Sequence, residues 1–259
     1  MRTAFSLVEL SIVLVILGLL TGGILGGQAL IRSAEQRNFT TQVARYSTSV
    51  LTFRDKYFGI PGDFNLASNF WGAADGSTGM TAACLTATAA GTCNGDGNGS
   101  LAAITYSHEP YRFWQHLALA GLIEGNYTGV TGPLAASDVV AGVNVPATRL
   151  ATNSVVVPYS LPNTTGSTWW FPGSYGSVAF LLGGDTGGSN FNGDSPIVLP
   201  ELAWNMDTKM DDGRPGTGKV TTMLSSRRGN CASSDDAASA TYVLNYSTAS
   251  CVLLIPSGI

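Results

Sequence analysis

Charged side chains are scarce in this chain. Only 12% of its 259 residues are Asp, Glu, Lys or Arg, about half the usual share of a globular protein. The formal net charge is −4, and the sequence contains no run of Lys or Arg. A surface that follows nucleic-acid phosphates needs such a basic run, so we expect no nucleic-acid binding.

Catalytic signatures are missing as well. The chain has two histidines, His108 and His116, and no second His follows H-E at 108–109 at the H-E-x-x-H spacing. The T-G-K of 217–219 is followed by Val220, so it is not a phosphate-binding loop. No G-x-S-x-G occurs. The sequence therefore predicts a protein that is not an enzyme, with His116 as a buried or capping side chain.

The four cysteines fall into two close pairs, Cys84 with Cys93 and Cys231 with Cys251. If the body of the protein is exported, this pairing is the simplest of the three possible disulfide connectivities. Two disulfides would indicate an oxidising compartment, which also suits the low charge and the 32 glycines. Four reduced, buried thiols are the alternative.

One long hydrophobic segment opens the chain. Between residues 5 and 25 the polar residues are Ser6, Glu9, Ser11 and Thr21. A helix of this length spans the ~30 Å hydrocarbon layer of a membrane. A secretory signal peptide would have a shorter apolar core with its small residue after it, whereas Ala4 precedes this one. We expect a single-pass membrane helix whose C-terminal body lies outside the cytoplasm.

The helical pattern continues beyond the membrane segment. Apolar residues recur at spacings of mostly three and four from Ala29 to Tyr57, which predicts one amphipathic helix that ends before the IPGD of 60–63. Gly18, Gly22 and Gly26 form small-xxx-small steps that let helices approach closely. The alternative is a composition that is merely compatible with lipid.

Glu9 is the unusual residue in the membrane segment. A carboxylate at mid-bilayer costs ~2.5–3.5 kcal/mol on insertion scales, so it normally has a cation partner. No Lys or Arg lies within helical reach inside the segment, so such a partner would come from another chain. The alternative is that Glu9 extends its carboxylate toward the lipid headgroups.

The N-terminal sequence RTAFSLVELSIVLVILG (2–18) resembles the start of type IV prepilins and of the pseudopilins of type II secretion. The resemblance implies a leader over residues 1–4 and cleavage between Ala4 and Phe5. It also implies a methylated Phe5 as the new N-terminus, with Glu9 as the fifth mature residue. The family usually has Gly before the cleavage site, where this chain has the slightly larger Ala4.

The same resemblance implies a mode of assembly. Glu9 would meet the Phe5 ammonium of a neighbouring subunit in a pilus (fimbrium) or pseudopilus. The implied partners are other pilins, the prepilin peptidase, an inner-membrane assembly platform and, before assembly, membrane lipid. The protein would move from the inner membrane to a periplasmic or extracellular filament. The alternative of another class is a surface binding protein or enzyme that keeps an uncleaved anchor.

The remaining residues, 58–259, are predicted to form one globular head after the helix of residues 5–57. We expect an α+β fold with helices over 110–124 and 200–210. Strand-like runs occupy 137–157, 168–172, 177–183 and 241–255. The loop of 56–76 should pack on the long helix through Phe64, Phe70 and Trp71. The WWF of 169–171 is either an exposed adhesive patch or part of the core.

Two acidic segments suggest metal ligands. Asn94, Asp96 and Asn98 alternate before Gly99, as in the first half of an EF-hand loop, and Glu109 is placed to supply the missing closing carboxylate. We therefore expect a Ca²⁺ site, with an ordinary Asn/Asp/Gly turn as the alternative.

The second acidic segment follows the predicted helix of 200–210. Asp207, Asp211 and Asp212 lie near Lys209 with Gly213 as a cap, and this stretch resembles the DxKxDDGxPxxG segment of pilin-like heads. A plain helix end with a solvated turn is the simpler interpretation. A second Ca²⁺ site or a salt bridge to the next subunit is the alternative.

Overall fold

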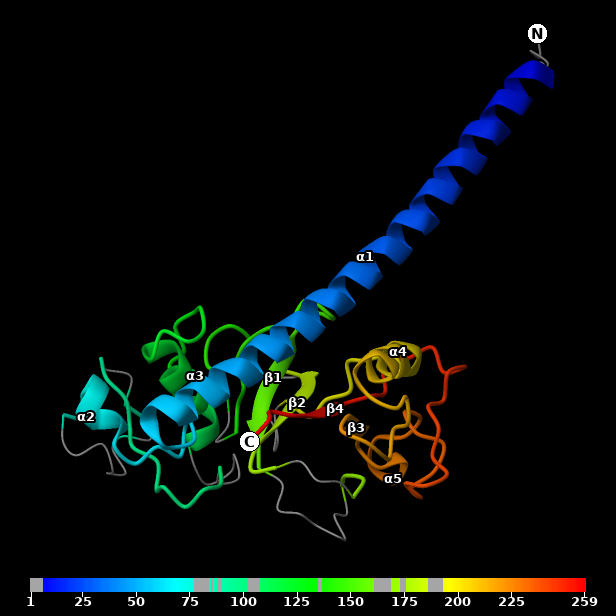
Figure 1. Ribbon diagram of the computed structural model, residues 1–259. Helices are drawn as coiled ribbons and strands as arrows, with labels where there is room; N and C mark the ends of the chain where they lie inside the picture. The colour runs from blue at the N-terminus through cyan, green and yellow to red at the C-terminus, as the bar shows by residue number, and fades with distance from the viewer. Residues whose placement is uncertain are drawn as a thin grey trace.

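A computed structural model describes residues 7–76, 84, 86–87, 90–101, 108–134, 137–160, 169–172, 176–185 and 193–259. A single long helix, α1 (Leu7–Tyr57, 51 residues), projects from a globular head, as Figure 1 shows. Within these described residues the head contains four short helices and four strands. They are α2 (Ala67–Trp71), α3 (Glu109–Leu119), α4 (Pro200–Met210), α5 (Ser225–Arg228), β1 (Ser154–Tyr159), β2 (Ala179–Gly184), β3 (Thr221–Thr222) and β4 (Leu253–Pro256). The predicted α+β layout, with a long N-terminal helix, is confirmed.

The two halves of α1 have different surroundings. Residues 7–25 are exposed, with Leu10 at 59% and Ile24 at 58%. Phe39, Val43 and the other residues of one stripe in the second half are buried in the head. The full stripe is Phe39, Val43, Tyr46, Val50 and Phe53. The apolar face was expected to begin near Ala29, but Leu30 is 73% exposed, because the head covers α1 only from Phe39 onward.

Aromatic contacts join α1 to the rest of the head. The ring centroids of Tyr46 and Trp114 lie 4.8 Å apart, and Trp114 stacks on Phe180 at 5.8 Å. These three residues come from α1, α3 and β2, so the core lies between the long helix, the helix α3 and the sheet. Each buried aromatic ring contributes roughly 1.5–3 kcal/mol of transfer free energy.

The sheet is small and antiparallel, with the strand order β1-β2-β4-β3. Val156 of β1 lies opposite Leu182 of β2, and Leu181 of β2 lies opposite Leu254 of β4. The strands β1 and β2 are buried along almost their whole length, so neither alternates between buried and exposed residues. In the described part of the chain most of 137–153, 169–172 and 241–252 is not in strands. Those predicted strands are wrong, and only isolated bridges such as Trp170 with Met223 remain.

Turn residues explain where the helices end. α3 was expected to reach residue 124 and stop at Gly125, but it ends at Leu119, because Gly121 adopts a left-handed φ of 71°. α1 ends at Tyr57, where Phe58 has a φ of 54°. The predicted loop of 56–76 contains the short helix α2, and its Phe64 and Trp71 rings lie 5.8 and 6.2 Å from Phe53.

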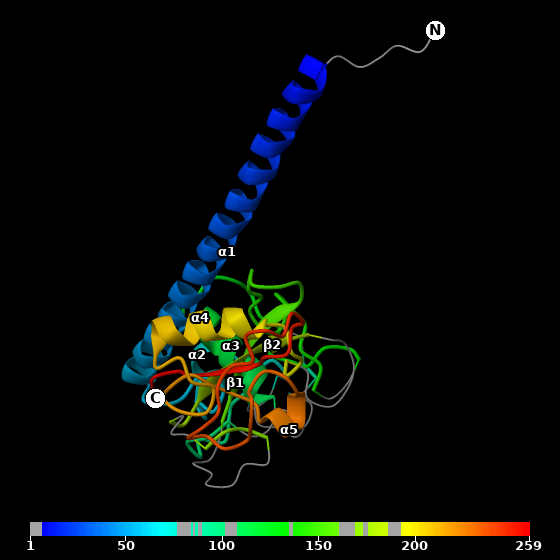
Figure 2. The same ribbon diagram turned by 90° about the vertical axis from the view of Figure 1, so that its right-hand side faces the viewer.

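The helix α4 matches its predicted range and crosses the head beside α1, as Figure 2 shows. The Lys209 ammonium donates a hydrogen bond of 2.8 Å to Oε1 of Gln36 on α1. This contact links the C-terminal end of α4 to α1, a few residues beyond the exposed half of the long helix.

Candidate functional site

The exposed half of α1 is the first candidate site. By length and composition α1 can cross a membrane, with a mean hydropathy of 2.4 over its most apolar window. Ser11 and Thr21 donate their hydroxyl protons to the carbonyls of Val8 and Leu17 at 2.8 Å, which satisfies both groups within the helix. Glu9 is the single ionisable residue between 7 and 31; it lies exposed in the first turn of α1. Ala4 and Phe5 lie outside the described residues.

The glycines of this half leave open space around the helix. A Cβ added at Gly18, Gly22 or Gly26 would meet no other atom within 4 Å, and the same holds at Gly23 and Gly27. Packing within one copy of the chain therefore does not require these glycines. Each costs ~1 kcal/mol of helix propensity relative to Ala, so a reason for their presence lies in what surrounds the helix.

The disulfides fasten two irregular regions of the head. Cys84 pairs with Cys93, and Cys231 pairs with Cys251, which confirms the connectivity expected from proximity. The buried Arg112 of α3 holds the first disulfide loop, because its guanidinium donates to the carbonyl oxygens of Cys84 (2.9 Å) and Ala87 (3.2 Å).

His116 is a structural residue at the centre of this region. It is fully buried, as the sequence predicted. Its Nδ1 accepts the Gly62 N–H at 3.0 Å, while Nε2 lies 3.0 Å from Oγ1 of Thr92 and 3.1 Å from the Cys93 carbonyl oxygen. The carbonyl assigns the proton to Nε2. Burial lowers the pKa of His116 to about 3, so the ring stays neutral at ordinary pH.

Three carboxylates meet near the far end of α1. One oxygen each of Asp63, Asp96 and Glu109 lies within 4.8 Å of the others. The Asp63 carboxylate accepts the backbone N–H groups of Gly97 (2.7 Å) and Gly99 (2.9 Å). Burial raises the pKa of Asp63 to about 6, and the neighbouring Asp96 and Glu109 add to the rise. Their mutual repulsion is the feature that a cation would relieve.

Two of the four predicted metal residues, Asp96 and Glu109, belong to this carboxylate cluster. The other two, Asn94 and Asn98, hydrogen-bond to groups around it, and the Asn98 side-chain amide donates to Oδ2 of Asp96 at 2.7 Å. Oδ1 of Asn94 accepts the Ser68 N–H at 2.7 Å, at the start of α2. Oδ1 of Asn98 accepts the Ser100 N–H at 2.8 Å. The sequence pattern missed Asp63, which lies in the IPGD segment 33 residues before Asp96 in the chain. That segment was interpreted only as a helix stop.

The second acidic segment organises its own loop. The buried Asp207 accepts hydrogen bonds from the Tyr242 hydroxyl (2.8 Å) and the Gly213 N–H (3.2 Å). Asp211 accepts the N–H groups of Lys219 and Val220, and Asp212 accepts the Thr217 hydroxyl. Burial raises the pKa of Asp207 to about 7. These bonds favour the simpler interpretation, a helix end followed by a structured turn.

The WWF segment is mainly part of the core. Trp170 and Phe171 are 4% and 0% exposed. Trp169 is 45% exposed, but the Arg227 guanidinium lies over its ring at 4.4 Å from the centroid. Burial of two of the three rings leaves little aromatic surface for an adhesive patch.

Comparisons with known proteins return nothing for this chain: no family model, no curated protein and no solved structure matches it. We therefore infer its function from the residues described above, of which the exposed half of α1 and Glu9 are the most specific.

The buried neutral His116 predicts a loss of stability in acid. The unfolded chain binds a proton near pH 6.5, while the folded pKa is about 3, so the stabilisation by His116 is complete above pH 6.5 and declines as the pH falls. In denaturant titrations of the full chain in detergent, the advantage of wild type over His116→Gln should shrink by about 1.4 kcal/mol per pH unit below 6.5. The exposed control Thr52→Ala should show no such slope. A constant advantage from pH 7 to 5 would contradict the assignment.

Proposed function

We propose that this chain is a type IV pilin-like structural subunit, processed at its N-terminus and assembled into a pilus or pseudopilus filament. The observation that carries the proposal is the exposed apolar half of α1, residues 7–31, which continues without a break into a helix that forms part of the head's core. A rod of this kind cannot stay uncovered in water, so lipid or other copies must surround it.

The glycines support packing against other helices. Gly18, Gly22 and Gly26 leave room at the surface of α1, and nothing within one copy fills it. Small residues at such spacings let helix backbones approach each other in an apolar medium. Lipid would surround this half before assembly, and the same half of neighbouring subunits would surround it in the filament.

Glu9 supplies the specific part of the proposal. Cleavage after Ala4 creates an ammonium at Phe5, and this ammonium on one copy pairs with the Glu9 carboxylate of the next. In a medium of low dielectric such a pair sets the register of the helices more than it adds net stability. Uncleaved copies lack this ammonium and carry an extra cytoplasmic segment, so they stay in the inner membrane.

Two other assignments share some of these features. A type II secretion pseudopilin would use the same helix and the same processing, and genes for secretion components beside this one would favour it. A surface protein with an uncleaved anchor would use α1 only as a tether. That alternative gives no role to the open glycine positions or to Glu9.

Mass spectrometry of the mature N-terminus separates processing from simple anchoring. In the cells that produce the chain, we expect the N-terminal peptide to begin at Phe5 with a methyl group on its nitrogen. Replacement of Ala4 by Arg should block cleavage and leave the full leader, while Ala4→Gly should be cleaved like wild type. A mature protein that retains Met1 would contradict the proposed function.

We also propose that the cluster of Asp63, Asp96 and Glu109 binds Ca²⁺. Three carboxylates within 4.8 Å provide the hard oxygen ligands that Ca²⁺ prefers, and backbone carbonyls or water would complete its six to eight ligands. A bound cation would compensate for the burial that raises the pKa of Asp63, and for the smaller contributions of Asp96 and Glu109, and would fasten the loop of 94–99 to the end of α1.

Thermal unfolding with and without Ca²⁺ tests this site. For the full chain in detergent, saturation at about 100 times the Kd should stabilise the fold by ~2.7 kcal/mol and raise Tm by several degrees. Asp96→Asn should abolish most of the increase, while Glu201→Gln, at an exposed carboxylate outside both acidic groups, should keep it. An unchanged Tm in millimolar Ca²⁺, or an increase that persists in Asp96→Asn, would refute a calcium site here.

A further inference from the structure

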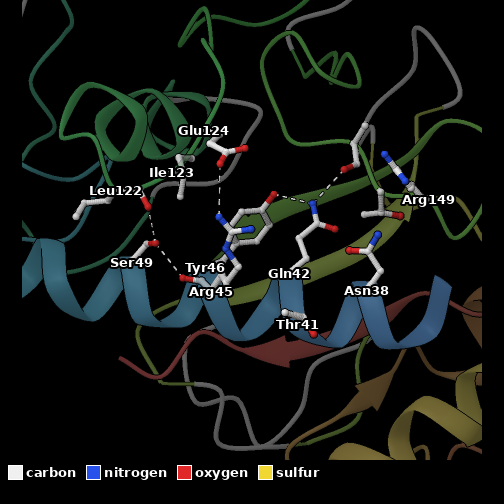
Figure 3. A pocket seen from close by; sticks show the side chains of 12 residues that line it. Asn38, Thr41, Gln42, Arg45, Tyr46, Ser49, Leu122, Ile123, Glu124 and Arg149 are labelled. Carbon is white, nitrogen blue, oxygen red and sulfur yellow. Dashed lines mark hydrogen bonds and ion pairs between the residues drawn. The ribbon is translucent and has the colours of Figure 1, made fainter. Parts of the chain in front are cut away.

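A polar groove runs along one side of α1 within the head. It has a volume of about 430 Å³ and lies between α1 and the loops of 122–124 and 147–149. Figure 3 shows the side chains of α1 reaching into it, with Arg45 near one end and Arg149 near the other. Between them Gln42 donates to the Tyr46 hydroxyl at 2.8 Å and to the Ala147 carbonyl at 3.2 Å.

The groove contains two arginines, Arg45 and Arg149, that form at most weak ion pairs with the described residues of the chain. No partner of the exposed Arg149 guanidinium is found among the described residues. Arg45 faces Glu124 at 3.8 Å, but their side chains are 69% and 95% exposed, and such a pair contributes little energy. The groove therefore presents guanidinium groups to a partner with carboxylates.

Acidic residues outnumber basic ones in the first part of the head's sequence. The helix α1 contains five basic and three acidic residues, whereas residues 58–199 contain two basic and eight acidic ones. The densest acidic group among the described residues of 58–199 is the carboxylate cluster of Asp63, Asp96 and Glu109. Asp96 is exposed, and the cluster stays net negative with one Ca²⁺ bound. A second copy of this chain thus offers an exposed carboxylate, that of Asp96, to the two guanidinium groups of the groove.

The two surfaces lie at different heights on α1. The groove is lined by α1 residues between positions 38 and 49, while Asp63 and Gly97 share a cavity wall with Arg54 and Phe58 at the end of α1. Fifteen residues of helix separate these levels, which is about 20 Å at 1.5 Å per residue. A parallel second copy must therefore be shifted by about 20 Å along the helix axis to place its acidic end beside the groove of the first.

We propose that the groove of Arg45 and Arg149 binds the Asp96 surface of a second, axially staggered copy of this chain. The contact joins different surfaces of the two copies, so it is heterologous, and repetition of a heterologous contact that does not close builds an open helical chain. Complementary charges would select this stagger over others. The inference rests on the proposed filament function and names a contact between the heads.

Charge reversal in the full chain, in its producing cells, tests the contact. Arg149→Glu should lower the assembled fraction by about tenfold. Arg149→Glu combined with Asp96→Lys should assemble better than Asp96→Lys alone, because both of these variants lack the proposed calcium ligand and only in the double variant does the groove again meet an opposite charge. Lys219→Glu, a charge reversal at an exposed residue that does not line the groove, should assemble like wild type. Glu124→Gln should assemble at least as well, since it removes the acid from the groove.

Several outcomes would overturn the inference while leaving the proposed function standing. They are an Arg149→Glu variant that assembles normally, and a double variant that assembles no better than Asp96→Lys alone although its processed monomer keeps both disulfides. A photo-reactive residue at Thr41, which lines the groove, should cross-link to a peptide from residues 58–199 of another copy. Cross-links only to lipid or to unrelated proteins would also overturn it. Failure of the wild-type chain itself to be processed or assembled would instead count against the proposed function.

Discussion

The buried stripe on the second half of α1 is the contact on which the rest of the structure depends. Phe39, Val43, Tyr46, Val50 and Phe53 form one wall of the head's core, so the long helix is not a tether attached to a finished domain. Removal of one such ring would leave a cavity and cost roughly 3–5 kcal/mol, a large part of the stability of an ordinary domain. A mechanical force on the exposed half of α1 therefore acts directly on the core, because both belong to the same continuous helix.

Buried polar side chains hold the segments of the head that lie outside the apolar core. The head is rich in loops, and three of them are hydrogen-bonded to one buried side chain each. Arg112 bonds to the first disulfide loop, His116 to the turn of 60–63, and Asp207 to the turn after α4. Such groups are costly to bury without hydrogen bonds and stabilising once bonded. They explain how a chain with 12% charged residues fixes long segments that are neither helix nor strand.

Local signals in the sequence were sufficient for some of this structure. The spacing of apolar residues predicted α1, Pro200 marked the start of α4, and the proximity of the cysteines gave both disulfides. Features set by distant parts of the chain were missed. Asp63 joins Asp96 and Glu109 only because the turn after α1 folds back onto the loop of 94–99. The apolar runs of 137–153 form turns that pair with β1 only through an isolated bridge, Ala147 with Val155. The exposure of Leu30 likewise depends on where the head ends, which periodicity does not reveal.

The central claim is that one helix stabilises the head with one half and assembles copies with the other, through the carboxylate of Glu9. The most direct measurement compares the assembled fractions of Glu9→Gln and Glu9→Asp with that of wild type, together with the denaturant midpoint of each detergent-solubilised monomer. The account predicts at least a tenfold loss of assembly for Glu9→Gln, a smaller loss for Glu9→Asp, which keeps the charge, and unchanged midpoints for both. Normal filament yield from Glu9→Gln, or a midpoint that falls along with assembly, would contradict it.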